Sequence, residues 1–503
     1  MYRILRPNKD TYITDRVVKG SRTYSANVGA AGSLDLFKLY GLTSTGSVPN
    51  TELSRLLIKF DLQPLQDLID AERIDINHPG FNASLNLFDV YGGQPTPKNF
   101  VVDVYPLSRS FDEGIGRDVV YYSDRDVANF LTASSQGTWL VSGCALGGGL
   151  PGLVDYVTAS VTVLSGASLK SSQRFITGEE DLSVDVTKIV SATIVGLLPD
   201  EGFRISFDSS QEVDQHSYFV KRFASRTAYD EDKRPRLIIR YDDSVQDDSQ
   251  NLYLDTPAQL FMYNRGASGL TNLVSGSAMT PVVGSNSVIL RLLTEVSGGT
   301  FELAFTGSQH RNGAVNVNGV YSASVLLPST EPVYAAKLTQ SSSIKLTPIW
   351  GSLDGTVAYM TGSTIEAHPP NRSSTAASKQ YYVTVTNVQD SFFTDEEPTF
   401  RINIFDRNSP VLKVVKTPVS PPGIVTRDVH WQVRDQVTGK IEIPFDTVYN
   451  STRASADDSG MFFKLSMDSL TRDRSYVIDI MFTGEVHCTY KAVSPPFKVS
   501  DLR

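Results

Sequence analysis

Short runs in which apolar and polar residues alternate recur along this chain, and they constrain its fold more than any other feature. The alternation is clear at residues 203–207, 381–385, 400–404 and 476–482. Successive side chains of a β-strand point to opposite faces of the sheet, so a period of two indicates strands with one buried face. The runs are rich in Val, Ile, Thr, Phe and Tyr, which pack well on a pleated surface. The pattern therefore predicts an all-β fold.

Helical patterns are few and short. Residues 65–71 and 124–131 each predict a short helix, the second with Ser123 as its N-cap. The segment 186–195 is expected to begin as a strand and to turn helical at Thr187. The strands are separated by clusters of Gly, Ser, Asn and Pro that are typical of turns. Because strands do not alternate with long helices, βαβ units are not expected.

The length of the chain, 503 residues, favours about three domains. The segment 242–250 contains four aspartates and almost no apolar residue. Like charges so close together repel one another and stay solvated, so residues 243–250 are predicted to form an acidic linker. The first domain is then expected to span residues 1–242.

A second boundary is expected near residue 408, where Asn408, Ser409 and Pro410 follow a strand pattern. The proline-rich segment 418–423 comes soon after it, and strands cannot run through prolines because these lack an amide donor. Residues 251–408 are predicted to form one β-sandwich domain and residues 409–503 another. The last segment has the length and strand spacing of an immunoglobulin-like sandwich.

Charge and composition narrow the choice of partners and location. The net charge of −9 argues against a nucleic-acid partner, which would select a basic face. The two cysteines, Cys144 and Cys488, lie far apart and are expected to be free thiols. No stretch approaches the ~18 apolar residues of a membrane span. Residues 1–7 lack the apolar core of a signal peptide, so the protein is expected to be made in the cytosol without one.

Five short motifs follow one another in the first half of the chain, and their order matters more than any one of them. They are DTYI at residues 10–13, RLLIKFDL at 55–62, LSVDVT at 182–187, FASR at 223–226 and PRLIIRY at 235–241. Taken together, these motifs resemble the DNRLRE family of β-jelly-roll domains. The resemblance implies that residues 1–242 form a jelly roll that serves as a structural or binding module in extracellular or virion proteins.

The last part of the chain carries a second resemblance. Residues 435–446 read as a hairpin with Thr438 and Gly439 at its turn, followed by an Ile-Pro-Phe-Asp strand end, and the motif DDSGMFF follows at residues 457–463. This arrangement resembles the tail, neck and baseplate proteins of tailed bacteriophages. It implies an immunoglobulin-like module of a phage particle.

Motifs of catalysis are not apparent in the sequence. The six histidines show neither HExxH spacing nor a Cys-pair metal motif, and no G-x-S-x-G elbow nominates a nucleophilic serine. A Ser-His-Asp triad stays open, because triads assemble in space rather than in sequence. The glycine-rich run at residues 143–152 lacks the Lys-Ser/Thr of a phosphate-binding loop. It is interpreted as a flexible loop that could wedge against a neighbouring subunit, and the protein is predicted not to be an enzyme.

Calcium is the one ion that the jelly-roll resemblance suggests. Carbohydrate-binding jelly rolls often hold a structural Ca²⁺ between strand ends with carboxylates and backbone carbonyls. Their position in the pattern makes Asp10, Asp185 and Asp242 the candidate ligands. The alternative is that these aspartates are solvated caps and turn residues. No other cofactor is predicted.

Aromatic and cationic side chains supply two further hypotheses. Sugar binding would use exposed tyrosines, for which Tyr121-Tyr122, Tyr156 and Tyr381-Tyr382 are available, although one tyrosine of a strand pair should face the core. Arg226 ends a motif strand, and we expect its guanidinium to pair with a carboxylate such as Asp61 across strands.

These observations lead to one functional hypothesis and one alternative. The hypothesis is a non-enzymatic virion structural protein of a tailed bacteriophage, located in the neck, tail or baseplate. Its partners would be other virion proteins and copies of itself in a symmetric ring. The alternative is a carbohydrate-binding adhesin or receptor-binding fibre component that holds a glycan of the host surface. Neither hypothesis includes a nucleic-acid or membrane partner.

Overall fold

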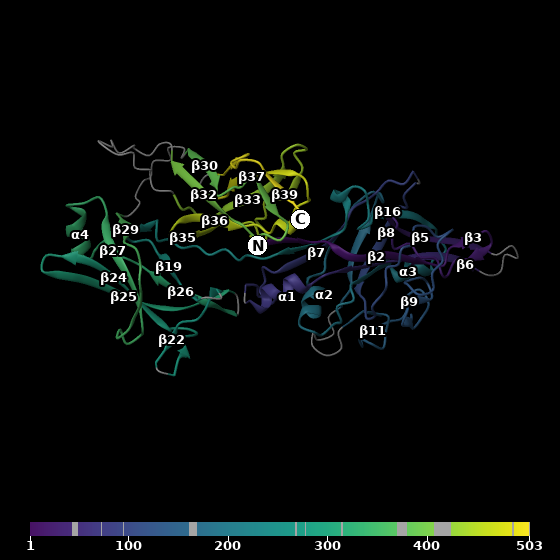
Figure 1. Cartoon of the computed structure of the whole chain (residues 1–503), viewed down its shortest axis with the longest axis horizontal. Helices are drawn as coiled ribbons and strands as arrows, with labels where there is room; N and C mark the ends of the chain where they lie inside the picture. The colour runs from purple at the N-terminus through teal and green to yellow at the C-terminus, as the bar shows by residue number, and fades with distance from the viewer. Residues whose placement is uncertain are drawn as a thin grey trace. The chain divides into compact units, whose positions relative to one another are not determined.

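The computed structural model describes residues 1–501 apart from 43–48, 72, 94, 160–167, 267–268, 277, 313–314, 370–379, 407–423 and 485–486. The chain is mostly β, with 46% strand and 8% helix, and its sheets include a curled half-barrel and a near-closed, barrel-shaped sheet (Figure 1). The predicted β class is therefore confirmed. All four runs of alternating residues form strands.

The chain divides into two compact units. The N-terminal unit contains Arg3–Asp67 and Asn82–Ile239, and the C-terminal unit contains Met1–Tyr2, Leu68–Phe81 and Arg240–Arg503. The change of unit at residues 239–240 lies close to the expected end of the first domain at residue 242. The sequence pattern gave no sign that residues 68–81 would join the later part of the chain.

The N-terminal unit is built on a seven-stranded antiparallel sheet. Its central pairing joins two of the motifs, because Asp10 lies opposite Ile58 in the register of their strands. The strand order is β13 (Ser171–Phe175), β8 (Phe100–Pro106), β15 (Phe203–Phe207), β6 (Pro49–Phe60), β5 (Ser33–Leu42) and β16 (Tyr218–Ala224), with β2 (Pro7–Thr14) also paired to β6.

A four-stranded sheet carries two more motifs. Its order is β1 (Tyr2–Leu5), β17 (Arg236–Arg240), β7 (Asn82–Leu87) and β14 (Leu182–Asp185). Buried and exposed side chains alternate along β14: Leu182 and Val184 are buried, whereas Ser183 and Asp185 are exposed. Three two-residue or three-residue ribbons complete the strands of this unit: β3 (Val17–Val18) with β4 (Ser21–Arg22), β9 (Thr132–Ser134) with β10 (Gly137–Thr138), and β11 (Gly147–Gly148) with β12 (Tyr156–Val157).

Two of the three predicted helices are confirmed and the third is wrong. Helices α1 (Gln63–Asp70) and α2 (Thr187–Ile194) form as expected, and the structure adds α3 (Ser209–Val213) and a 3₁₀ turn at Glu231–Lys233. Residues 124–131 form bends instead of a helix. The side chain of Asn129 accepts hydrogen bonds from the amides of Leu131 and Thr132 at 2.8 and 2.9 Å, which offers the backbone a turn in place of a helix.

An eight-stranded sheet forms the first part of the C-terminal unit. It encloses a buried cluster that includes Tyr321, Tyr334 and Trp350. Its order is β18 (Leu252–Tyr253), β29 (Ile365–His368), β27 (Ile344–Gly351), β24 (Val288–Val296), β25 (Gly299–Asn312), β26 (Val315–Val325) and β19 (Ala258–Tyr263), with β28 (Ala358–Thr361) paired to β27. Smaller elements are β20 (Arg265–Gly266), β21 (Gly269–Leu270), β22 (Val274–Ser275), β23 (Thr280–Pro281) and helix α4 (Pro332–Leu338).

Two further sheets complete the C-terminal unit. One has the order β30 (Tyr381–Thr386), β32 (Thr399–Asp406), β36 (Gly460–Lys464) and β35 (Ser455–Asp457). The other has the order β31 (Ser391–Phe393), β39 (Phe497–Ser500), β37 (Ser475–Phe482), β33 (Val429–Asp435) and β34 (Ile441–Ile443), with β38 (Cys488–Tyr490) paired to β37. A 3₁₀ turn lies at Met467–Ser469. Rings pack between these sheets, as where Trp431 stacks on Phe463 with 4.7 Å between centroids.

The expected boundary between residues 408 and 409 lies outside the described residues, but the strands around it show that it does not separate two sheets. Phe400 of β32 lies opposite Phe463 of β36. Strands β30 and β32 were assigned to the domain 251–408, yet they share a sheet with strands that follow residue 454. The local cue was a proline-rich segment, and such a segment cannot tell which distant strand completes a sheet.

The acidic segment 243–250 was expected to be a solvated linker, and that expectation is wrong for its second half. Asp247 and Asp248 are 4% and 8% exposed. Gln246 bridges Ala456 of β35 in parallel, and the amide of Asp247 donates to the carbonyl of Ala456 at 3.1 Å. Asp248 pairs with Arg427 at 2.6 Å. Backbone pairing and one guanidinium therefore compensate for the charge that was expected to keep this segment in water.

Candidate functional site

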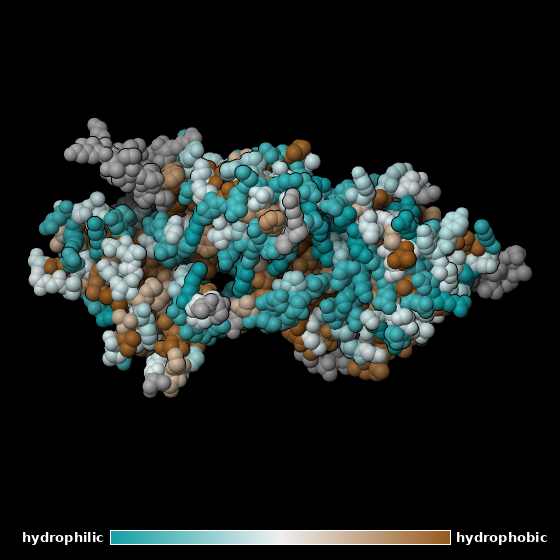
Figure 2. All heavy atoms as spheres, viewed as in Figure 1, coloured by the Kyte–Doolittle hydropathy of each residue, from teal (hydrophilic) through white to brown (hydrophobic). Residues whose placement is uncertain are grey.

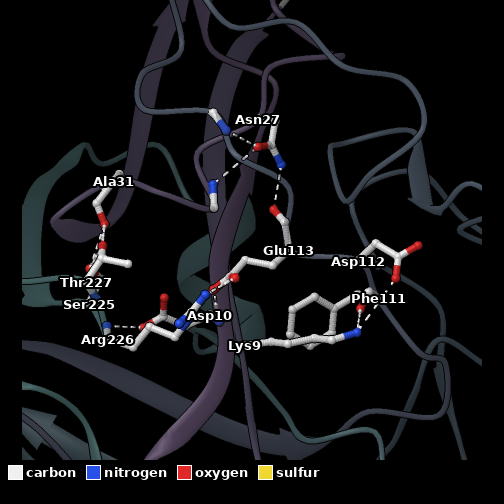
Figure 3. A network of polar contacts seen from close by, with 12 residues as sticks. Lys9, Asp10, Asn27, Ala31, Phe111, Asp112, Glu113, Ser225, Arg226 and Thr227 are labelled. Atoms are coloured by element: carbon white, nitrogen blue, oxygen red, sulfur yellow. Dashed lines mark hydrogen bonds and ion pairs between the residues drawn. The ribbon is translucent and has the colours of Figure 1, made fainter.

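Arg226 lies at the centre of a polar network in the N-terminal unit (Figure 3). Its Nε donates to Oε1 of Glu113 at 2.5 Å, and a second guanidinium nitrogen contacts Oε2. Its backbone amide donates to Oδ2 of Asp10 at 2.6 Å, and the amide of Asp10 donates to Glu113 at 2.8 Å. The expectation that Arg226 pairs with Asp61 is wrong. The carboxylate of Asp61 instead accepts a hydrogen bond from the amide of Gln63 at the start of α1.

Asn27 fixes the loop that carries Glu113. Its Nδ2 donates to the carbonyls of Glu113 and Ala128 at 2.8 and 3.0 Å, while its Oδ1 accepts the amides of Gly29 and Gly116. A Cβ at Gly116 would lie 1.9 Å from the backbone oxygen of Asn27, so only glycine fits there. All four hydrogen-bonding positions of the amide are used, so Asn27 holds Glu113 where Arg226 reaches it.

Asp10 is nearly inaccessible to solvent, and this affects its titration. Burial raises the pKa of Asp10 to about 7, and the negative charge of Glu113 adds to the shift, while the amide and guanidinium of Arg226 oppose it. Oδ1 of Asp10 is buried and has no hydrogen-bond partner among the described residues. A carboxyl group in this setting is easier to bury as the neutral acid than as the anion.

The three predicted calcium ligands occupy separate places. Asp10 belongs to the network above. Asp185 is exposed and accepts the amide of Thr187 at 2.8 Å, at the start of α2. Asp242 accepts the amide and hydroxyl of Ser244 at 3.1 and 2.6 Å. Among the described residues, no group of three or more His, Cys, Asp or Glu side chains could hold a metal ion. The cap and turn interpretation describes Asp185 and Asp242 better than a shared metal site.

The tyrosines considered for sugar binding lie in different surroundings. Tyr121 is 82% exposed and Tyr122 is 40% exposed, and neither lies in a strand. Tyr381 is buried and Tyr382 exposed, as the strand pattern predicts. Tyr156 covers a buried arginine, with the guanidinium carbon of Arg204 4.2 Å from its ring centroid.

The glycine-rich loop is anchored rather than free, which corrects the expectation of a flexible loop. Arg55 donates to the carbonyl of Gly143 at 2.6 Å, and Arg204 donates to the carbonyl of Cys144 at 3.0 Å. Asp155 is fully buried and accepts backbone amides of the loop at Leu140, Val141 and Leu146, over 2.7 to 3.1 Å. We call residues 140–153 the anchored loop.

One carboxylate holds both arginines of this anchor. Glu212 accepts Nε and Nη2 of Arg55 at 2.8 and 2.7 Å, and an Nη of Arg204 lies 3.7 Å away. Burial alone would raise the pKa of Glu212, but the two guanidinium groups outweigh it and hold the pKa below its usual value. Burial raises the pKa of the Cys144 thiol to about 12, so this cysteine is not a nucleophile at neutral pH.

The anchored loop exposes a set of large aliphatic side chains. Leu150 and Leu153 are 52% and 69% exposed. Some brown, hydrophobic spheres lie among white and teal ones in Figure 2 near the position where Figure 1 labels β11, a strand of this loop. The set consists of Leu140, Val141, Leu146, Leu150 and Leu153. A rigid backbone that presents apolar side chains to water is typical of an interaction surface.

The C-terminal unit contains a cavity of about 790 Å³. One wall comes from the eight-stranded sheet and includes Tyr253, Tyr263 and Trp350. The opposite wall includes Asp247 and Phe462. Volumes of this size are usual for small-molecule sites in proteins.

Comparisons with known proteins do not assign this chain to a protein family. No protein-family model matches it, and no curated protein matches it either. In the part of the chain that the structure describes, no helix combines the length and the apolar character needed to cross a bilayer.

Two of these features were missed by sequence reasoning. In the sequence, Glu113 is only one member of an acidic pair with Asp112, and nothing in its neighbourhood links it to Arg226. The cavity joins residues near 250, 350 and 460, and the aromatic residues among them alternate like ordinary core positions. The one sign of the cavity in the sequence is Asp247, an acidic residue shortly before the strand β18.

Proposed function

We propose that this protein is a non-enzymatic structural component of a tailed-bacteriophage particle, assembled in its neck, tail or baseplate. In this proposal the N-terminal unit is a DNRLRE-like jelly roll, and the paired sheets after residue 380 form an immunoglobulin-like sandwich. The observation that carries the proposal is the anchored loop, which offers an apolar contact surface to a neighbouring subunit.

The arrangement of the motifs supports the jelly-roll part of the proposal. All five motifs overlap strands of the N-terminal unit, namely β2, β6, β14, β16 and β17. The first and fourth motifs are in direct contact through the hydrogen bond from Arg226 to Asp10. Residues that define a family pattern are expected to meet when the pattern specifies one fold.

The anchored loop has the physical properties of an assembly surface. Ordering a mobile loop at an interface costs conformational entropy. A loop that buried charges already hold in place does not lose this entropy when it binds. The charges that hold it are Arg55, Arg204 and Asp155, each less than 9% exposed. Burial of Leu150 and Leu153 against a neighbour would remove their apolar surface from water, which stabilises the contact.

Mass spectrometry of purified particles from the phage that encodes the chain tests the location. Peptides of this protein should appear at a constant ratio to those of the portal and tail proteins. Particles that contain portal and tail peptides but none from this chain would contradict the proposal.

A double substitution tests the surface. Leu150→Asp with Leu153→Asp should leave the chain folded and prevent its incorporation into particles. Leu326→Asp is the matched control, because Leu326 is 51% exposed and lies in the other unit. Normal incorporation of the double variant would show that the anchored loop does not form the contact.

A further inference from the structure

The cavity of the C-terminal unit has fixed walls. The amide of Asp248 donates to the carbonyl of Gln259 at 2.9 Å, and its side chain accepts the amide of Gln259 and pairs with Arg427. Gln250 donates to the carbonyl of Asp458 at 2.7 Å. These bonds tie the segment 246–251 to both neighbouring sheets, so the cavity is formed before any ligand arrives.

Aromatic rings form the floor and the sides of the cavity. Trp350 and Phe261 are buried in the floor, at 2% and 7% exposure. Tyr253, Tyr263 and Phe462 are half-buried, so part of each ring faces the opening. The ring of Tyr253 lies 5.7 Å from that of His368, which limits its movement. Half-buried rings held in place offer flat apolar faces at little entropic cost.

Polar groups surround these rings. Asp247 is 4% exposed, and its carboxylate accepts the amide of Ser249 at 3.0 Å. Asp457 is held by Arg401 at 2.6 Å. Glu366 and Asp458 are exposed at the rim.

The charge of the lining selects the class of ligand. Four carboxylic acids line the cavity together with one arginine and one histidine, and a second arginine, Arg401, pairs with one of the acids from outside the lining. The acids are Asp247, Glu366, Asp457 and Asp458, and the lining cations are Arg265 and His368. This balance disfavours an anionic ligand such as a phosphate or a sialylated glycan. The exposed carboxylates of Glu366 and Asp458 also disfavour a wholly apolar ligand, which would remove water from them without replacing its hydrogen bonds.

An extended peptide is a poor fit to the neighbouring sheet edge. Strand β35 is the edge strand beside the cavity. Its Ala456 already exchanges backbone hydrogen bonds with Val245 and Asp247, at 2.8 and 3.1 Å. The backbone groups that a peptide strand would pair with are therefore occupied.

We propose that this cavity binds a neutral oligosaccharide. The C–H faces of its sugar rings would pack on Tyr253, Tyr263 and Phe462, and its hydroxyl groups would donate to the carboxylates. Sugars suit such a lining because they combine apolar ring faces with a rim of hydroxyl groups. The inference does not rest on a role in a phage particle, and it places sugar recognition in the C-terminal unit rather than at Tyr121 and Tyr122.

An array of neutral and acidic glycans, probed with the full chain, tests the inference. Isothermal titration with the best neutral oligosaccharide then gives the affinity. Tyr253→Ala should weaken binding roughly 10-fold, which corresponds to the loss of one ring contact. Glu366→Gln should weaken binding less, because its carboxylate is at the rim.

Matched controls are Tyr382→Ala and Glu302→Gln, which change exposed residues of the same unit outside the cavity. Both should bind like the parent. Three results would overturn the inference: no neutral glycan bound at millimolar concentration, equal loss of binding in the control and cavity variants, or preferential binding of acidic glycans or peptides. Reduced binding by Tyr121→Ala alone would place the site in the N-terminal unit instead.

Discussion

Glu212→Gln should strongly destabilise the N-terminal unit. Glu212 is 13% exposed at its side chain and accepts both Nε and Nη2 of Arg55, whose side chain is 8% exposed. The substitution keeps the shape but removes the carboxylate of Glu212, which among the described residues is the only one in contact with the two buried guanidinium groups of Arg55 and Arg204. Whichever way the new amide is turned, its NH₂ group faces an arginine donor. Breaking a buried ion pair in this way costs about 3–5 kcal/mol.

Differential scanning calorimetry of the full chain measures the effect. For a unit of this size, about 3–5 kcal/mol corresponds to a fall in Tm of roughly 6–20 °C. The transition of the C-terminal unit should not move. Glu231→Gln is the control, because its pair with Arg234 is exposed at 41% and 31%, and such pairs contribute below about 1 kcal/mol.

The same substitution should loosen the anchored loop, since Arg55 and Arg204 also hold the carbonyls of Gly143 and Cys144. Amide hydrogen exchange of residues 140–153 should then be faster than in the parent. A Glu212→Gln protein that melts within about 2 °C of the parent, with unchanged exchange in this loop, would refute the reasoning about the buried charges.

Three other predictions concern single residues. Arg226→Ala should cost about 1–3 kcal/mol in a urea titration, less than a fully buried pair because its side chain is 35% exposed, and an unchanged midpoint would count against the network. The raised pKa of Asp10, about 7 in the folded state against an ordinary 3.8, means that the native state binds more protons between these values. Stability should therefore fall as pH rises from about 4 to about 7, and Asp10→Asn should flatten this dependence; a rise over this range that Asp10→Asn does not alter would contradict it. A thiol reagent at pH 7.5 should label Cys488, which is partly exposed, and leave the buried Cys144 unmodified until the chain is unfolded, as counted by intact mass.

The local sequence pattern is sufficient to predict the strands, but it does not predict which strands pair with one another. The alternation at residues 381–385 predicts a strand and also predicts which tyrosine is buried, because both depend on neighbours two residues apart. The partner of that strand, β32, continues into a sheet with β36, more than 50 residues further on. A proline-rich stretch of sequence is a strong local signal, but it cannot tell whether the strands before it and after it share a sheet.

Charge patterns were misread for a similar reason. The aspartates near residue 245 repel one another in isolation, which predicts exposure. Arg427 lies 179 residues from Asp248 and removes that penalty by pairing with it. Arg226 was correctly expected to need a carboxylate, yet Glu113 could not be chosen over Asp61 without knowing which loop crosses the end of β16. In both cases the missing information was the non-local geometry.

The two units use their buried charges differently, and this difference underlies the two proposals. In the N-terminal unit the guanidinium and carboxylate groups bond mainly to one another and to loop carbonyls, so they fix the shape of the loops. Under the proposed function, recognition is then the task of exposed side chains such as Leu150. In the C-terminal unit, a buried carboxylate such as Asp247 lines a cavity beside rings that are only half-buried. The first arrangement suits a partner with an apolar surface, and the second suits a ligand with many hydroxyl groups. The loop substitutions should therefore abolish assembly and spare glycan binding, and Tyr253→Ala should have the opposite effect. Loss of both activities in either variant would show that the two surfaces are not separate.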